Sequence, residues 1–278
     1  MHTKPLAVAL TAVVLAGFLP PVAQGVVVMV PLQDRNSTLD VFVQGGFGMT
    51  DWMVDGVSHL PIQWFWYRIG PTGGEQPVEA LGLIDYRVSD TDWDVGGEHL
   101  AVLYGNPNAL TVELSFTLAG GNAGSRQSDI AETITITNHG TSTLELHFFQ
   151  YCDLDLGGTS QDLYAAIVGG NTAQQQDTTD WFSEAVTTPM PAHREVSTYG
   201  GLLASLYDAA PTTLSDQVGP IGPGDLVWGF QWDFTIRPSR SVIISKDKLI
   251  VPEPAAAVLL GLGAMIIVPH KARRHQSV

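Results

Sequence analysis

Apolar and polar residues alternate along much of this chain, and this period of two limits the fold more than any other feature of the sequence. In residues 110–118, Leu, Val, Leu, Phe and Leu are separated by Thr, Glu, Ser and Thr. Residues 225–236 repeat the pattern, with Trp228, Phe230 and Trp232 on one face. Successive side chains of a β-strand point to opposite sides, so each stretch presents one face to a core and the other to water. The pattern therefore predicts antiparallel strands with a solvated face.

Two pairs of neighbouring strands are predicted to form β-hairpins, namely 130–137 with 143–151 and 225–236 with 241–247. The first connection contains Asn and Gly, which tolerate the left-handed conformations of a tight turn. Shorter strands are expected at 39–44, 63–69, 82–88, 100–104, 163–168 and 184–187, with one short helix at 202–208. The sequence shows no crossover helices, internal repeats or Ser- or Pro-rich linker. These features favour an all-β fold in which residues 26–250 form a single wide antiparallel β-sandwich.

The charge of the chain limits its partners. The sequence has 13 Lys and Arg residues against 28 Asp and Glu, which gives a formal net charge of −15. No Lys occurs between Lys4 and Lys246. Such an acidic surface repels nucleic acid and anionic lipid but attracts divalent cations. Nucleic-acid binding is therefore excluded from the functions considered.

The N-terminal residues are expected to be a targeting signal rather than part of the fold. Residues 1–25 combine a short basic start, an apolar run at 6–19 and small residues just before Val26. The apolar run is shorter than the roughly 20 residues that a spanning helix needs. We therefore expect a signal helix that signal peptidase removes, and an exported chain that begins near Val26.

The C-terminal end has three parts in a fixed order. Val251-Pro252-Glu253-Pro254 comes first, an apolar stretch at 255–268 follows, and a basic end at 269–278 closes the chain. The basic residues of the last part include Lys271, Arg273 and Arg274. The prolines are expected to hold the start of this tail extended and accessible, because proline lacks the N–H that would continue a helix or strand. The apolar stretch would form a short transmembrane helix, with the Lys and Arg residues cytoplasmic.

This tail resembles the PEP-CTERM sorting signal of Gram-negative bacteria, which is also labelled an ice-binding protein C-terminal motif. The resemblance implies that an exosortase-type membrane protease recognises Pro252, Glu253 and Pro254 and cuts nearby. It also implies a host that makes exopolysaccharide, and an inner-membrane intermediate followed by release to the cell surface or extracellular matrix. The body is similar to uncharacterised exported β-proteins that carry this tail, in the segments 48–52, 63–68 and 245–248. The alternative is an ordinary C-terminal anchor that is never cut.

One polar loop has the composition of a calcium site. Asp90, Asp92 and Asp94 alternate in a loop that continues through two Gly to Glu98, and Ca²⁺ takes roughly six to eight oxygen ligands of this kind. An EF-hand is excluded because Val95 stands where that motif needs Gly. An irregular calcium loop and a solvated turn both stay open. A second and weaker candidate has three carboxylates in a short span: Asp153, Asp155 and Asp162.

Two Trp residues are candidates for a glycan platform, because Trp93 and Trp181 lie in polar stretches where a ring would be exposed. The aromatic run at 63–68 is instead expected in the core, since a strand buried on both faces is continuously apolar. The sequence has no nucleophile elbow, P-loop, zinc motif or dinucleotide fingerprint. The chain is therefore predicted to be a structural or adhesive surface protein and not an enzyme. The alternative is a carbohydrate-binding or carbohydrate-active β-sandwich module that uses Ca²⁺.

Overall fold

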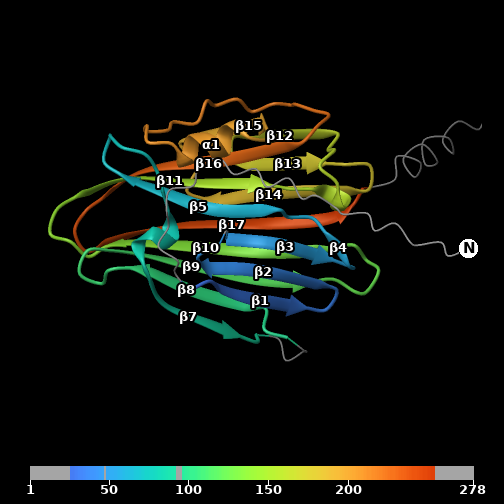
Figure 1. Ribbon diagram of the computed structural model, residues 1–278, viewed down its shortest axis with the longest axis horizontal. Coiled ribbons are helices and arrows are strands. Elements are labelled where there is room, and N and C mark those ends of the chain that lie inside the picture. The colour runs from blue at the N-terminus through green and yellow to red at the C-terminus, as the bar shows by residue number, and fades with distance from the viewer. Residues whose placement is uncertain (1–25, 47, 92–95, 254–278) are drawn as a thin grey trace, which may run out of the picture.

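Two antiparallel β-sheets pack face to face around one core in the part of the chain that the computed structural model describes, residues 26–46, 48–91 and 96–253 (Figure 1). This arrangement confirms the predicted all-β sandwich. The predicted signal helix and C-terminal transmembrane helix lie outside the described residues. Within those residues, no helix is long and apolar enough to cross a membrane.

Each sheet brings together strands that are distant in the sequence. Sheet A has the order β1-β2-β3-β5-β11-β16-β15, with β4 beside β3 and β6 beside β5. Its strands are β1 (Val28–Asp34), β2 (Ser37–Gln44), β3 (Gly48–Val54), β4 (Val57–Ser58), β5 (Ile62–Ile69), β6 (Gln76–Pro77), β11 (Leu144–Asp153), β16 (Leu226–Ile236) and β15 (His193–Thr198). Sheet B has the order β12-β13-β14-β17-β10-β9-β8-β7. Its strands are β12 (Tyr164–Val168), β13 (Thr172–Gln176), β14 (Asp180–Thr188), β17 (Arg240–Pro252), β10 (Ser128–Asn138), β9 (Leu110–Gly120), β8 (His99–Gly105) and β7 (Leu83–Ser89).

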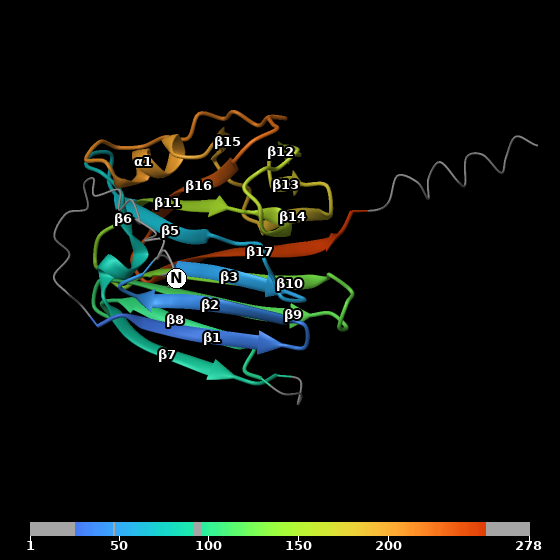
Figure 2. The same ribbon diagram turned by 45° about the vertical axis from the view of Figure 1, so that its right-hand side comes forward.

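The alternation correctly predicted most of these strands, and the short helix expected at 202–208 is present as α1. In β9, Leu114 and Phe116 are fully buried whereas Glu113 is exposed. Full burial of each such apolar side chain contributes about 1.5–3 kcal/mol. The helix α1 (Gly201–Tyr207) lies over the outer face of sheet A (Figure 2). There Tyr207 packs edge-on against Trp66 of β5, and Trp66 is fully buried, which confirms the predicted core position of that aromatic strand.

Neither predicted hairpin exists, because in each pair the two strands belong to different sheets. β10 pairs with β9 and β17 in sheet B, whereas β11 pairs with β5 and β16 in sheet A. Both short connections therefore cross from one layer of the sandwich to the other. Buried Asn138 holds the two crossings together, since its side-chain amide donates to Ser142 O at 2.9 Å and to Ile236 O at 2.8 Å. The turn residues predicted the change of direction but not the change of layer, because alternation does not say which sheet a strand joins.

Four charged side chains are buried inside the sandwich. Lys246 and Lys248 on β17 lie between Glu132 on β10 and Glu184 on β14, and all four are at most 2% exposed. Each lysine forms ion pairs with both glutamates; Lys248 Nζ lies 2.8 Å from Glu184 Oε2. Burial opposes the charge on Lys248, but the two glutamates outweigh it and raise the pKa. A slip of β17 by one residue would leave buried charges unpaired, so this tetrad fixes the register of the central strands.

The end of β17 changes the expected boundary of the tail. Pro252 is part of this strand and pairs with Asp180 of β14, and the backbone N–H of Glu253 donates to Thr179 O at 2.9 Å. The strand tolerates Pro252 because the neighbouring β10 ends opposite Ile250, so no partner on that side needs the missing N–H. The start of the predicted sorting motif is thus attached to sheet B rather than extended away from it. The rest of the tail lies outside the described residues.

Candidate functional site

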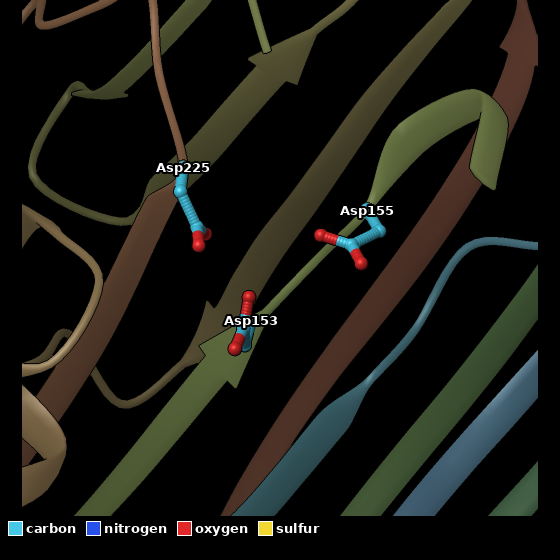
Figure 3. A group of neighbouring side chains, drawn as sticks. All are labelled: Asp153, Asp155 and Asp225. Atoms are coloured by element: carbon cyan, nitrogen blue, oxygen red, sulfur yellow. The ribbon is translucent and has the colours of Figure 1, made fainter. Parts of the chain in front are cut away.

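Three aspartates from two parts of the chain meet at one end of sheet A. Asp153 is the last residue of β11, Asp155 directly precedes the short 3₁₀ helix η2 (Leu156–Gly158), and Asp225 directly precedes β16. The antiparallel register pairs Asp153 with Val227, so the end of β11 and the start of β16 lie side by side. One carboxylate oxygen from each aspartate lies within 4.8 Å of the other two, and the three side chains converge on a common space (Figure 3). We call this group the aspartate cluster.

The aspartate cluster contains oxygens that the protein leaves without hydrogen bonds. Asp153 is only 4% exposed; its Oδ2 accepts a long hydrogen bond of 3.5 Å from the Tyr151 hydroxyl, and its Oδ1 has no partner among the described residues. Asp162 is fully buried beside the cluster, where its backbone exchanges two 2.9 Å hydrogen bonds with Gly224. Neither carboxylate oxygen of Asp162 has a well-formed hydrogen bond within the described chain. Buried polar atoms are nearly always satisfied, so these oxygens need partners that the described residues do not supply, and a bound cation or ordered water can provide them.

The same crowding raises the pKa of every carboxyl group here. Burial, followed by the charges of Asp225 and Asp155, raises the pKa of Asp153 to about 7. Burial raises the pKa of Asp162 to about 8, against the lowering influence of the neighbouring Gln175 amide. Burial also raises the pKa of Asp155, with a further contribution from Asp225, and the pKa of Asp225 itself. Neighbouring carboxylates repel one another, so these groups resist ionising together in the free protein. A bound cation would offset the repulsion and hold them in the charged form.

The donor atoms select the class of cation that would fit. All of them are carboxylate oxygens, which suit hard cations such as Ca²⁺ and Mg²⁺ rather than zinc or copper. Ligands at about 2.3–2.6 Å from one calcium ion lie at most about 5 Å apart, and the oxygens of the aspartate cluster fall within that limit. Mg²⁺ demands shorter distances and a strict octahedron, which one buried and two half-buried aspartates do not impose. The residues present therefore fit calcium best.

The loop that the sequence favoured as a calcium site is only partly described. Three of its candidate residues lie outside the described chain: Asp92, Trp93 and Asp94. Asp90 is exposed after β7, whereas Glu98 is 3% exposed and its Oε1 accepts a hydrogen bond from the backbone N–H of Thr91. Burial opposes the charge on Glu98, but the hydrogen bonds from Thr91 hold its pKa below the ordinary value. Glu98 thus links the two ends of the loop through its hydrogen bond with Thr91. Calcium binding in this loop stays a prediction.

Trp181 lies on strand β14 and not in a polar loop, as the sequence had suggested. Its half-buried ring stacks on that of Tyr164 from β12, with centroids 6.2 Å apart and an interplanar angle of 20°. The residues before it, 177–180, are Asp, Thr, Thr and Asp, and this polar run hid the start of the strand. Trp181 alternates with the buried Phe182, so it belongs to the outward face of sheet B.

Sequence reasoning grouped Asp153, Asp155 and Asp162 but missed Asp225. The contact between Asp153 and Asp225 depends on the pairing of β11 with β16, which are far apart along the chain. A long-range pairing of this kind leaves no local signal. The one usable clue was that Asp153 and Asp225 each stand at the end of a strongly apolar strand, where a charged residue marks the rim of the sandwich.

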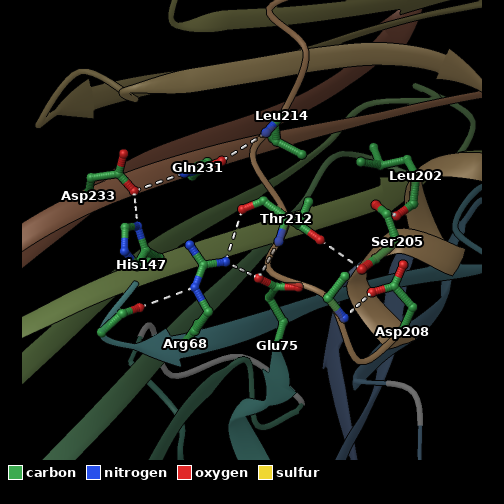
Figure 4. A network of polar contacts seen from close by, with 12 residues as sticks. Arg68, Glu75, His147, Leu202, Ser205, Asp208, Thr212, Leu214, Gln231 and Asp233 are labelled. Atoms are coloured by element: carbon green, nitrogen blue, oxygen red, sulfur yellow. Dashed lines mark hydrogen bonds and ion pairs between the residues drawn. The ribbon is translucent and has the colours of Figure 1, made fainter. Parts of the chain in front are cut away.

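A second polar network fastens residues 208–214 over the outer face of sheet A (Figure 4). Arg68 on β5 forms a buried ion pair with Glu75 and donates to Thr212 O at 3.0 Å. The backbone N–H of Thr212 in turn donates to Glu75 Oε1 at 2.9 Å. The guanidinium of Arg68 also lies over the ring of Phe149, 5.8 Å from its centroid. Because these groups bond mainly to one another, the network holds the covering segment in place.

Comparison with known proteins shows the fold alone. No protein-family model and no curated sequence matches the chain. A bacterial glucoamylase solved with acarbose aligns at a TM-score of 0.53 and 6% identity, over 83% of this chain and 32% of the glucoamylase. A putative aldose 1-epimerase from Escherichia coli K12 aligns at a TM-score of 0.46 and 12% identity, over 81% of this chain and 99% of that protein. The chain thus spans about a third of the glucoamylase, with which it shares a β-sandwich fold.

Proposed function

We propose that this chain is an exported calcium-binding β-sandwich protein of the cell surface or extracellular matrix, with a structural or adhesive role and no catalytic activity. The convergence of Asp153, Asp155 and Asp225, with a buried oxygen that lacks a partner, is the observation that supports calcium binding. Export is supported by the signal-like residues 1–25 and by the resemblance of residues 251–278 to a sorting tail.

Calcium in the aspartate cluster would fasten three segments: the end of β11, the loop into η2 and the start of β16. It would replace repulsion among carboxylates by attraction to a common ion. A ligand that binds only the folded state stabilises it by about 2.7 kcal/mol when its concentration is a hundred times its Kd. Extracellular calcium modules work with a Kd of about 10⁻⁴–10⁻³ M. With a Kd in this range, the full value of about 2.7 kcal/mol would be reached at about 10–100 mM CaCl₂, and lower concentrations would give a smaller stabilisation.

Thermal unfolding of the purified chain at pH 8, in EDTA, CaCl₂ or MgCl₂, tests this function. Calcium should raise Tm, and magnesium should raise it less. Asp225→Asn should abolish the response. Asp85→Asn, which changes an exposed aspartate on β7, is the matched control and should keep it. A calcium response that survives Asp225→Asn would reject the aspartate cluster as the site.

The route of export follows from the two ends of the chain. Signal peptidase would release the mature chain near Val26, and the apolar stretch 255–268 would hold it briefly in the inner membrane. An exosortase-type protease would then cut near Pro252, Glu253 and Pro254. The product would reach the surface or a matrix that contains exopolysaccharide. Intact mass of the surface-exposed form tests this route, because a mature chain that still ends at Val278 would contradict it.

A carbohydrate-binding module is the second candidate function. The stacked pair of Trp181 and Tyr164 on the outward face of sheet B favours it, because adjacent aromatic rings offer a flat apolar surface to a sugar ring. Binding of the purified chain and of Trp181→Ala to a glycan panel tests this idea. Equal binding by both proteins would rule out Trp181 as the platform.

A further inference from the structure

The aspartate cluster has a closed side and an open side. Asp153 is buried at the floor, next to the buried ring of Tyr151. Asp155 and Asp225 are half-buried, so they reach the cluster from the rim. A cation held by all three would therefore contact protein on the inner side and solvent on the outer side.

The number of protein ligands leaves coordination positions for another molecule. Three aspartates that each supply one oxygen give a calcium ion three ligands, whereas the ion takes roughly six to eight. The remaining positions on the solvent side would be held by water. Water on calcium exchanges readily for other neutral oxygens, and two adjacent hydroxyl groups of a sugar present such oxygens at a suitable spacing.

An exposed aromatic side chain stands next to this open side. Tyr199 directly follows β15, and its backbone N–H donates to the carbonyl oxygen of Asp225 at 3.0 Å. The register that pairs Thr198 with Leu226 brings Tyr199 opposite Asp225 and onto the same face of sheet A. Its side chain is 57% exposed.

We propose that the aspartate cluster, loaded with calcium, binds a neutral polysaccharide through two vicinal hydroxyl groups of one sugar, with the Tyr199 ring packed against that sugar. This inference rests on the proposed calcium site and names its ligand. The strongly acidic chain disfavours a polyanion, which leaves neutral polymers as the better partners. The Trp181 and Tyr164 pair lies on sheet B, whereas the proposed site lies on sheet A, so the two surfaces can be tested separately.

The test is binding of the purified chain to a panel of immobilised neutral glycans that covers the common hexoses and pentoses, in calcium and in EDTA. We expect binding to at least one glycan that EDTA abolishes and calcium restores. Tyr199→Ala should weaken this binding about tenfold, as expected for the loss of one aromatic contact, while its calcium-induced rise in Tm stays. Tyr86→Ala, which removes an exposed tyrosine from β7, is the matched control and should bind as the parent does.

The outcomes separate the two claims. The proposed function fails, and this inference with it, if calcium does not raise the Tm of the parent chain. Both fail likewise if calcium still raises the Tm of Asp225→Asn. If the rise in Tm is present but no glycan binds in a calcium-dependent way, this inference alone is overturned. Calcium-dependent glycan binding that Tyr199→Ala leaves intact, or that Trp181→Ala removes, would also overturn it.

Discussion

Replacement of Asp153 by Asn should stabilise the calcium-free protein at alkaline pH, although the residue is buried. Burial and the neighbouring Asp225 and Asp155 raise the pKa of Asp153 from 3.8 to about 7. The folded chain thus binds this proton more tightly than the unfolded chain does. The protonated Asp153 therefore makes a contribution to the free energy of unfolding that is fully present below about pH 4. This contribution is lost as the pH rises towards 7 and is gone at pH 8.

The size of the effect follows from the pKa shift. The difference between 3.8 and about 7 corresponds to about 4 kcal/mol of stability lost at pH 8. Asn carries no charge, so it avoids this loss, and its NH₂ group can donate to Asp155 or Asp225. Imperfect packing of the amide would offset part of the gain, at about 1–2 kcal/mol. We therefore expect Asp153→Asn to gain about 2 kcal/mol at pH 8, or roughly 4–8 °C in Tm for a chain of this length, and to gain little at pH 4.

Differential scanning calorimetry in EDTA at several pH values measures this difference, and excess calcium should reverse the order. With calcium the parent chain should be the more stable, because the variant has lost a ligand. Asp129→Asn is a matched control, since burial and Asp247 raise the pKa of Asp129 to about 7 on the outward face of β10 in sheet B. This control should also flatten the pH profile but keep the calcium response. The reasoning would be refuted if calcium-free Asp153→Asn were less stable than the parent chain at pH 8, by the same amount as at pH 4.

Three further predictions concern the core, the crossings and the tail. Glu184→Gln should destabilise the fold by about 3–5 kcal/mol, because Lys248 would keep its buried charge with only Glu132 left to neutralise it. Urea unfolding measures this loss. A loss no larger than that of Glu113→Gln, which changes an exposed glutamate, would contradict the role of the tetrad. Asn138→Ala should cost about 1–3 kcal/mol in the same assay, since the carbonyl oxygens of Ser142 and Ile236 lose their donor, and the hydrogen bond to Ile236 is buried. An unchanged urea midpoint would show that the crossings do not depend on Asn138. Replacement of Pro252, Glu253 and Pro254 by Ala should leave membrane insertion intact but make uncut chain accumulate in the inner membrane. Cell fractionation and intact mass measure this accumulation. Normal release of the variant would count against recognition of the motif.

Local patterns in the sequence were enough to predict most of the fold. The alternation in β9 gave strand type and buried face, because the side-chain period of a strand is a local property. In β16 the alternation predicted the strand but not its burial: residues 226–232 are buried on both faces, because α1 and the segment 208–214 cover the outer face of sheet A. The same information could not place β10 and β11 in different sheets. That choice depends on the long-range pairing of β10 with β17 and of β11 with β5, and both depend on packing between distant segments.

The candidate site was predictable only in part. Asp153 and Asp155 stand two residues apart at the end of an apolar run, so the sequence could mark them. Asp225 joins them through the β11 and β16 register, and Tyr199 joins through the β15 and β16 register. The buried tetrad was missed for a similar reason. The apolar alternation of β17 is interrupted by Lys246 and Lys248, and only the neighbouring strands supply the Glu132 and Glu184 that neutralise them.

The most direct test of the central claim is a crystal structure of the chain grown at pH 8 with millimolar calcium. We expect one calcium ion within about 2.3–2.6 Å of oxygens from Asp153, Asp155 and Asp225, with water on its open side. Asp162 should then lie beside the ion or hydrogen-bond to one of its waters, which would satisfy its buried oxygens. A structure in which the three aspartates stay protonated, bonded to one another and free of metal at that pH and calcium concentration would contradict the account.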